Sequence, residues 1–66
     1  MNSEQPNIIG KKAHSIDEFC KAHGISRSFY YKLRNAGKAP VEMHVEARVL
    51  ISDERAAEWR KQREAV

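Results

Sequence analysis

Residues 15–37, SIDEFCKAHGISRSFYYKLRNAG, decide the fold, because they predict two short helices joined by a turn that contains glycine. Ser15 and Glu18 have the spacing of a capping box, in which the serine accepts the main-chain N–H of Glu18 and the glutamate reaches back. A first helix should therefore begin after Ser15. Gly24 should end it, since glycine adopts the left-handed conformation without steric cost.

A second helix is expected to begin at Ser26, whose hydroxyl can cap its first turn. It should end near Gly37, and Pro40 prevents any continuation. Two short helices joined by a tight turn form a helix-turn-helix. The residues of the first helix that should enter the core are Ile16, Phe19 and Cys20.

The second helix has two different sides when its residues are placed at 100° intervals. The apolar side, which should join the core, contains Phe29, Tyr30 and Leu33. The opposite side contains Ser28, Tyr31 and Asn35, flanked by Arg27 and Lys32. Residues 24–41 contain no acidic residue, whereas a helix that only meets water usually mixes Glu with Lys. We therefore expect this polar side to face the major groove of DNA, where base edges present distinguishable donors and acceptors.

The segment after Pro40 alternates between apolar and polar residues, which is typical of a strand. In residues 41–51, VEMHVEARVLI, the side chains expected to point one way are Val41, Met43 and Val45. Those expected to point the other way are Glu42, His44 and Glu46. The β-branched run that follows predicts a returning strand, so the segment should form a hairpin with its tip near Glu46 to Arg48.

Ser52, Asp53 and Glu54 predict the start of a third helix, because a serine cap precedes two acidic residues at the positive end of the helix dipole. Ala56 and Trp59 should form its inner face. The fold class is therefore expected to be mainly α with a small β-hairpin. The order helix, turn, helix, hairpin, helix is that of a winged helix-turn-helix.

The chain of 66 residues allows one domain at most. We expect this domain to cover residues 14–66, preceded by a flexible N-terminal arm over residues 1–13. The net charge of +3 is uneven: residues 1–40 hold seven Lys or Arg against three Asp or Glu (+4), and residues 41–66 hold five against six (−1). A polyanion would therefore be expected on the basic half, which contains the helix-turn-helix.

The stretches SIDEFCKAHGISRSFYYKLRNAGKAP and VLISDERAAEW resemble the small excisionase and AlpA-type regulators of phages and mobile elements, within the MerR-like winged-helix group. The matching positions are Glu18, Cys20, Gly24 to Arg27, Tyr31, Leu33, Gly37, Pro40, Ile51 and Trp59. The wing departs from the group, which often has glycine and several arginines where this chain has Glu46-Ala47-Arg48. The resemblance implies sequence-specific binding of double-stranded DNA, either as a transcriptional regulator or as an excisionase that directs recombination.

These considerations predict one set of DNA-contacting residues and no catalytic ones. The set is Arg27, Ser28, Tyr31, Lys32, Arg34, Asn35, Lys38 and Arg48. Possible protein partners are an integrase or further copies of the chain on adjacent sites. No small-molecule substrate and no cofactor are expected.

Other functions receive less support from the sequence. The one cysteine and three histidines lack the spacing of a metal site, and nothing arranges Ser, His and Asp as a triad, so an enzyme is not expected. No apolar run is long enough to span a membrane, and we expect a cytoplasmic location in a bacterial host. The alternative is a protein-interaction module that docks on an integrase or a phage packaging or assembly partner. An interaction module would need an exposed apolar patch, and the only candidates for it are Ile8, Ile9 and Val66.

Overall fold

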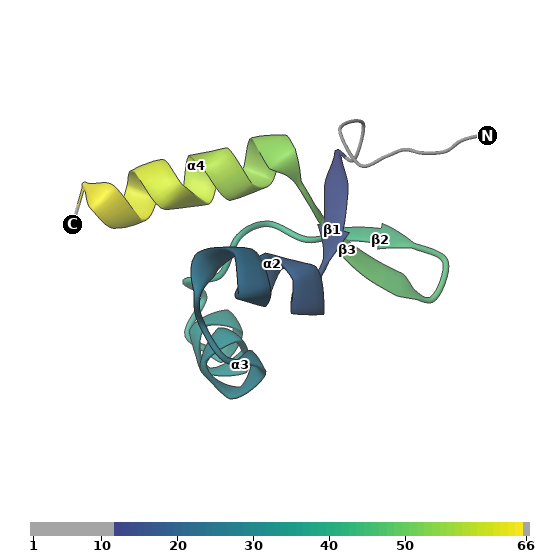
Figure 1. The fold of residues 1–66 in the computed structure, drawn as a ribbon, viewed down its shortest axis with the longest axis horizontal. Helices are drawn as coiled ribbons and strands as arrows, with labels where there is room; N and C mark the ends of the chain where they lie inside the picture. Colours follow the sequence, from purple (N-terminus) through teal and green to yellow (C-terminus); the bar gives the residue numbers. More distant parts are fainter. Residues whose placement is uncertain (1–11, 66) are drawn as a thin grey trace.

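The computed structural model describes residues 12–65, with the helices on one side and a β-hairpin extending from the other (Figure 1). It contains three helices and one three-stranded antiparallel sheet. In chain order the elements are β1 (Ala13–Ser15), α2 (Ile16–His23), α3 (Arg27–Asn35), β2 (Met43–Val45), β3 (Arg48–Ser52) and α4 (Asp53–Glu64). The strand order is β1-β3-β2, so β3 is central and β2 lies at an edge.

The helix boundaries at the turn between α2 and α3 follow from local side-chain chemistry, as the sequence predicts. Ser15 Oγ accepts the N–H of Glu18 at 3.1 Å, and Glu18 Oε1 accepts the N–H of Ser15 at 2.9 Å. Gly24 follows α2 with a φ of 67°, which reverses the chain. Ser26 then caps α3, since its Oγ accepts the N–H of Phe29 at 3.1 Å. The predicted capping box, glycine stop and serine cap are all confirmed.

The end of α3 is closed by a second glycine. Gly37 has a φ of 73°, and its N–H donates to the carbonyl of Arg34 at 3.1 Å. The N–H of Lys38 donates to the carbonyl of Leu33 at 2.8 Å. These two bonds satisfy carbonyls that would otherwise lack partners at the helix end, so the chain leaves α3 in a fixed direction toward β2.

Strand β1 was not predicted, because three residues of the sequence Ala-His-Ser carry no alternating pattern. It pairs with β3, with Ala13 opposite Ser52. The carbonyl of Lys12 also accepts the N–H of Asp53 at 2.9 Å, which ties this edge to the start of α4. The expected N-terminal arm therefore contributes at least Ala13 to the sheet, and its residues 1–11 lie outside the described residues.

The core lies where α2, α3, β3 and α4 meet, and all of its buried side chains are apolar or aromatic. They are Ile16, Phe19, Cys20, Tyr30, Ile51 and Ala56. Trp59 packs against this cluster, with its ring centre 5.3 Å from that of Phe19. The predicted burial of the α2 residues and the predicted inner face of α4 are confirmed.

Two residues of α3 that were predicted for the core lie outside it: Phe29 is on the surface, and Leu33 is half-buried but is not part of the core cluster. Phe29 is 48% exposed, whereas the ring of Tyr30 is fully buried and meets Phe19 edge to face at 5.8 Å. Tyr31 packs partly against the core on the other side of Tyr30, with ring centres 5.5 Å apart. Since neighbouring helix residues are 100° apart, a core direction centred on Tyr30 and shared with Tyr31 turns Phe29 away from the core.

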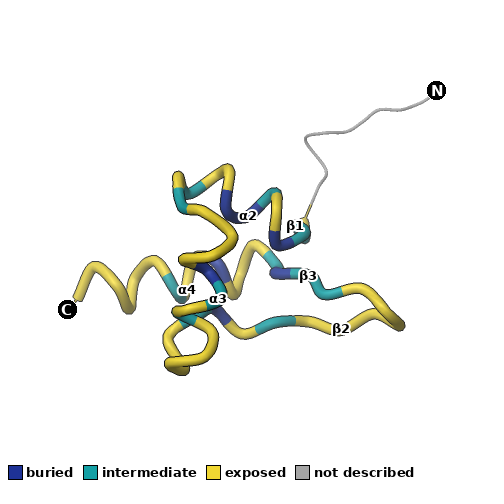
Figure 2. The backbone as a smooth tube through the Cα atoms, turned by 90° about the horizontal axis from the view of Figure 1, so that it is seen from below, coloured by how far each residue is buried: buried dark blue, intermediate teal, exposed yellow. Residues whose placement is uncertain are grey.

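The hairpin has an apolar outer face. Val41, Met43 and Val45 are 57%, 39% and 47% exposed, and Figure 2 shows that most residues of the hairpin near its tip are exposed. The alternate residues of β3 instead face inward, where Ile51 is fully buried and Val49 packs on the core. The expectation that exposed apolar residues would come only from Ile8, Ile9 and Val66 is therefore wrong. Those three lie outside the described residues.

Candidate nucleic-acid interface

The side of α3 that faces away from the core carries Ser28, Lys32 and Asn35. All three are exposed, and none of their side chains forms an ion pair or hydrogen bond with another residue between 12 and 65. A hydroxyl, an ammonium and an amide together offer both donors and acceptors. Side chains of these types can form hydrogen bonds with base edges, and α3 presents all three on one side.

Tyr31 lies at the flank of this surface instead of at its centre, where the helical periodicity had placed it. Its hydroxyl accepts a bond from Nη2 of Arg27 at 3.3 Å. The guanidinium carbons of Arg27 and Arg34 lie 5.7 and 5.8 Å from the centre of its ring. Tyr31 thus holds two basic side chains beside the exposed face of α3, through contacts with the ring that are favourable for cations.

Two of the predicted basic contacts are engaged by acidic residues from outside α3. Nη1 of Arg27 lies 2.6 Å from Oδ1 of Asp17, and Nη2 of Arg34 lies 3.1 Å from Oε1 of Glu42. The bond to Asp17, followed by the charge of that carboxylate, raises the pKa of Arg27 further above its ordinary value. The sequence shows no acid between residues 24 and 41, but folding brings one in from each flank.

The two ion pairs differ in how readily they can be exchanged for a phosphate. Both side chains of the Arg27–Asp17 pair are more than half exposed, so water and salt screen it and it contributes little. Glu42 is only 10% exposed, and it also accepts a bond from the hydroxyl of Tyr30 at 2.6 Å. Arg34 is therefore held more firmly than Arg27.

Glu42 is the residue of this region that the sequence analysis missed. Burial, then the bond to Glu42 and its charge, raises the pKa of Tyr30 well above its ordinary value. His44 Nε2 lies 3.9 Å from the same carboxylate. Because Glu42 accepts from Tyr30 and pairs with Arg34, it fixes α3 against the start of the hairpin. Its only signal in the sequence is that it is the first acid after a long basic stretch.

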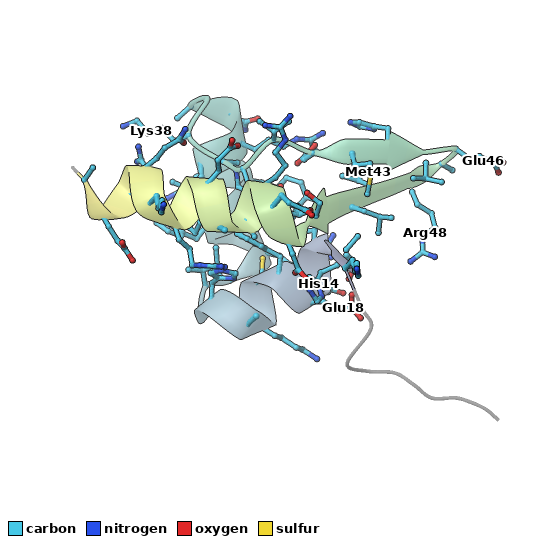
Figure 3. All side chains as sticks on the ribbon, turned by 90° about the horizontal axis from the view of Figure 1, so that it is seen from above. His14, Glu18, Lys38, Met43, Glu46 and Arg48 are labelled. Atoms are coloured by element: carbon cyan, nitrogen blue, oxygen red, sulfur yellow. The ribbon has the colours of Figure 1, made fainter. Side chains whose placement is uncertain are left out.

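The last two predicted contacts lie at opposite ends of the molecule (Figure 3). Lys38 is exposed just after α3, and its carbonyl accepts a bond from Nε1 of Trp59 at 2.8 Å. Arg48 is exposed at the start of β3 and is paired with Val45, so its side chain leaves the sheet on the outer, apolar face. The structure therefore brings together Lys38 and the α3 residues, and it places Arg48 apart from them.

The remaining chemistry of residues 12–65 is sparse. This part of the chain holds no cluster of three or more His, Cys, Asp or Glu side chains that could bind a metal ion. Burial raises the pKa of the Cys20 thiol, which keeps it protonated. None of the helices described has both the length and the apolar run needed to cross a bilayer.

Comparisons of the chain with protein-family models, with curated proteins and with solved structures find no match.

Proposed function

We propose that this chain is a small phage or mobile-element protein that binds double-stranded DNA sequence-specifically, as a winged helix-turn-helix. The observation that carries the proposal is the exposed trio Ser28, Lys32 and Asn35, which has no partner among the described residues and sits on a helix anchored in the core. Tyr30 and Glu42 fix the orientation of α3. A helix whose polar side only meets water would not need a fixed orientation. In this proposal α3 enters the major groove.

Within the groove, each of the three side chains has a natural partner. The ammonium of Lys32 can bond the O6 and N7 acceptors of guanine, and the amide of Asn35 can pair with N6 and N7 of adenine. The hydroxyl of Ser28 can donate to or accept from several bases. These contacts would choose the sequence, whereas phosphate contacts would set the register of the protein on the duplex.

Phosphate contacts come from the basic residues around the trio. Arg27 can exchange the exposed carboxylate of Asp17 for a phosphate at little cost, since that pair is open to solvent. Lys38 has no ion-pair partner within the described chain and stands next to α3. Arg34 stays paired with Glu42 and contributes no phosphate contact of its own. The hairpin takes the role of a wing because it follows α3 directly in the chain, and Arg48 is its one predicted contact with DNA.

The binding activity proposed here suits both uses that the family resemblance implies. A transcriptional regulator occupies its site, and an excisionase also bends the DNA for an integrase. Each needs the same reading of base edges by α3. The protein-interaction alternative is favoured by one observation, the exposed apolar face of the hairpin formed by Val41, Met43 and Val45.

The test is a paired titration. A duplex enriched by the wild-type chain from a random library is compared with a scrambled duplex of equal length. Lys32→Ala should lose about 1–3 kcal/mol of binding free energy on the enriched duplex and clearly less on the scrambled one. A Ser28/Asn35 double alanine variant should lose discrimination in the same way.

The matched control is Lys61→Ala, which removes the same charge from an exposed position on α4. It should weaken binding to both duplexes by the same small factor. If Lys32→Ala and the double variant keep full discrimination, α3 does not read sequence and the interaction-module alternative replaces this proposal.

A further inference from the structure

Strand β2 is an edge strand whose outer side pairs with no other strand among the described residues. It pairs with β3 so that Met43 is opposite Leu50 and Val45 is opposite Arg48, around a turn of two residues. The residues that flank a two-residue turn exchange both main-chain bonds, and opposite pairs then alternate between bonded and non-bonded. The N–H and C=O groups of Val45 and Met43 therefore point toward β3. Those of His44 point outward to the free edge, and the same alternation, extended by one residue beyond β2, would turn those of Glu42 outward as well.

The sequence of this edge is self-complementary. Residues 41–45 read Val-Glu-Met-His-Val. When two such segments run antiparallel with Met43 opposite Met43, each Val41 meets the Val45 of the other copy and each Glu42 meets the His44 of the other copy. In this register the main-chain-bonded pairs are formed by Glu42 of one copy and His44 of the other.

We propose that two copies of this chain pair through β2, antiparallel and with a two-fold axis at Met43, to form one continuous six-stranded sheet. The valines and methionines, which are exposed in the single chain, then form one apolar stripe across the outer face. On the opposite face an acidic side chain meets a histidine at each end, so no like charges stand opposite each other. A symmetric contact of this kind uses the same patch on both copies and closes as a dimer.

Charge decides the register and favours a second copy as the occupant. A shift that placed His44 opposite His44 would also set Glu42 opposite Glu46 of the other copy, which puts two carboxylates across from each other. Centring on Met43 avoids this and keeps all apolar residues together. An unrelated partner strand would match this alternation of valine, acid, methionine, histidine and valine only by coincidence.

The contact between the two β2 strands buries little surface, so it should form only at high protein concentration or when two copies are held together. Stable interfaces bury about 1,200–2,000 Å² in total, more than one short strand from each copy can supply. The dimer should therefore be weak in free solution and populated at high protein concentration. It should be favoured when two copies are held side by side, because the second contact is then intramolecular.

The pairing also fixes how the two copies of α3 face DNA, and this step alone rests on the proposed function. The side chain of Glu42 lies on the sheet face toward α3, since it contacts Tyr30 and Arg34. A two-fold axis perpendicular to the sheet keeps both copies of α3 on that same face. Both could then meet one duplex, and the target would be an inverted repeat.

Disulfide trapping tests the register without DNA. In the proposed dimer the two copies of residue 43 form a non-bonded pair, with Cα atoms about 4.5 Å apart, a separation that a disulfide can span. Met43→Cys at high concentration under mild oxidation should give a covalent dimer. Val45→Cys alone should not, because residue 45 faces residue 41. A mixture of Val41→Cys and Val45→Cys should cross-link. The wild-type chain controls for Cys20, which is buried.

A charge variant supplies an independent readout. His44→Glu in the Met43→Cys background places a carboxylate opposite Glu42 of the other copy and should reduce cross-linking several-fold, whereas His44→Lys should preserve it. The side chain of His44 is 62% exposed, but its Nε2 lies 3.9 Å from Glu42 of the same chain, so circular dichroism and thermal unfolding of both variants check that the fold is kept. The proposal is overturned if Met43→Cys stays monomeric, or if Val45→Cys alone cross-links as fast. Since no DNA is present, neither result bears on whether α3 binds DNA.

Discussion

The hydroxyl of Tyr30 connects the core to the candidate interface. The ring is fully buried against Phe19, and its Oη donates to Oε2 of Glu42 at 2.6 Å. The other carboxylate oxygen of Glu42 faces Arg34 at 3.1 Å. The carboxylate of Glu42 is largely removed from water, so it needs both Tyr30 and Arg34 as partners to remain charged there. These two contacts in turn fix the direction of α3.

Tyr30→Phe should lower the free energy of unfolding by about 2 kcal/mol, the usual contribution of a hydrogen bond to a charged group. Urea denaturation monitored by circular dichroism measures it. Tyr31→Phe is the matched control, since its hydroxyl has only one long bond to Arg27 at the surface. It should stay within about 0.5 kcal/mol of wild type. Equal losses in the two variants would mean that the bond to Glu42 is unimportant.

Burial of Tyr30, followed by the bond to Glu42, gives a pH dependence with a definite sign. Because the pKa of Tyr30 is raised on folding, its contribution is fully present below the pKa of an unfolded tyrosine, about 10. It is lost as the pH rises above that value. Unfolding titrations of wild type and Tyr30→Phe should therefore converge at alkaline pH. A constant gap between them would contradict the assignment.

Among the elements, α4 is held to the rest by Trp59. Its ring contacts Phe19 and His23, and its Nε1 fixes the chain just after α3 through the carbonyl of Lys38. Beyond Trp59, every described residue of α4 is exposed. Its apolar contacts with the rest of the domain therefore come mainly from Ala56 and Trp59, and Arg60 adds a polar contact of 3.0 Å with Nε2 of His23.

Trp59→Ala should destabilise the domain by about 3 kcal/mol, the lower end for loss of a large aromatic, because Trp59 is only partly buried. Trp59→Phe keeps most of the ring contact and loses only the bond to Lys38, so it should cost about 1 kcal/mol. Thermal unfolding of both variants measures the difference. An alanine variant that melts with wild type would show that α4 is not packed as described.

These elements also show what the sequence can and cannot predict. Caps act through residues three positions apart, so Ser15, Ser26 and both glycine stops could be predicted correctly. Contacts between elements are a different matter. The periodicity of α3 could not decide which of three adjacent aromatics would face the core, and it placed Phe29 inside.

Long-range pairing explains the other failures. Strand β1 forms only because β3 offers it a partner, and its own three residues carry no pattern. Glu42 was assigned to one side of a strand by alternation, but nothing local indicates that Tyr30 and Arg34 would meet it. The exposed side of α3 was predicted to hold Ser28 and Asn35 with Lys32 at its flank, and all three are exposed. Tyr31 was placed between them, but it packs partly against the core.

At the scale of the whole molecule, the two proposals use different parts of one small sheet: the face that carries α3 for DNA, and the free edge of β2 for a second copy. The face that carries Glu42 also carries α3 and its basic residues. The outer face carries the apolar stripe of the hairpin. A domain of this size buries only about 600–1,000 Å² on DNA, so a second copy would supply what one copy lacks in affinity and in the number of base pairs read.

The salt dependence of DNA binding by the wild-type chain tests the central claim most directly. Arg27 and Lys38 are the proposed phosphate contacts beside α3, and neutralising about two phosphates gives a log–log slope of roughly −1.8 for each bound copy. Fluorescence anisotropy on a labelled duplex between about 50 and 200 mM salt measures this slope. We expect a straight line near that value. Affinity that does not change with salt, or no binding at the lowest salt, would contradict the proposal that α3 is a DNA-binding surface.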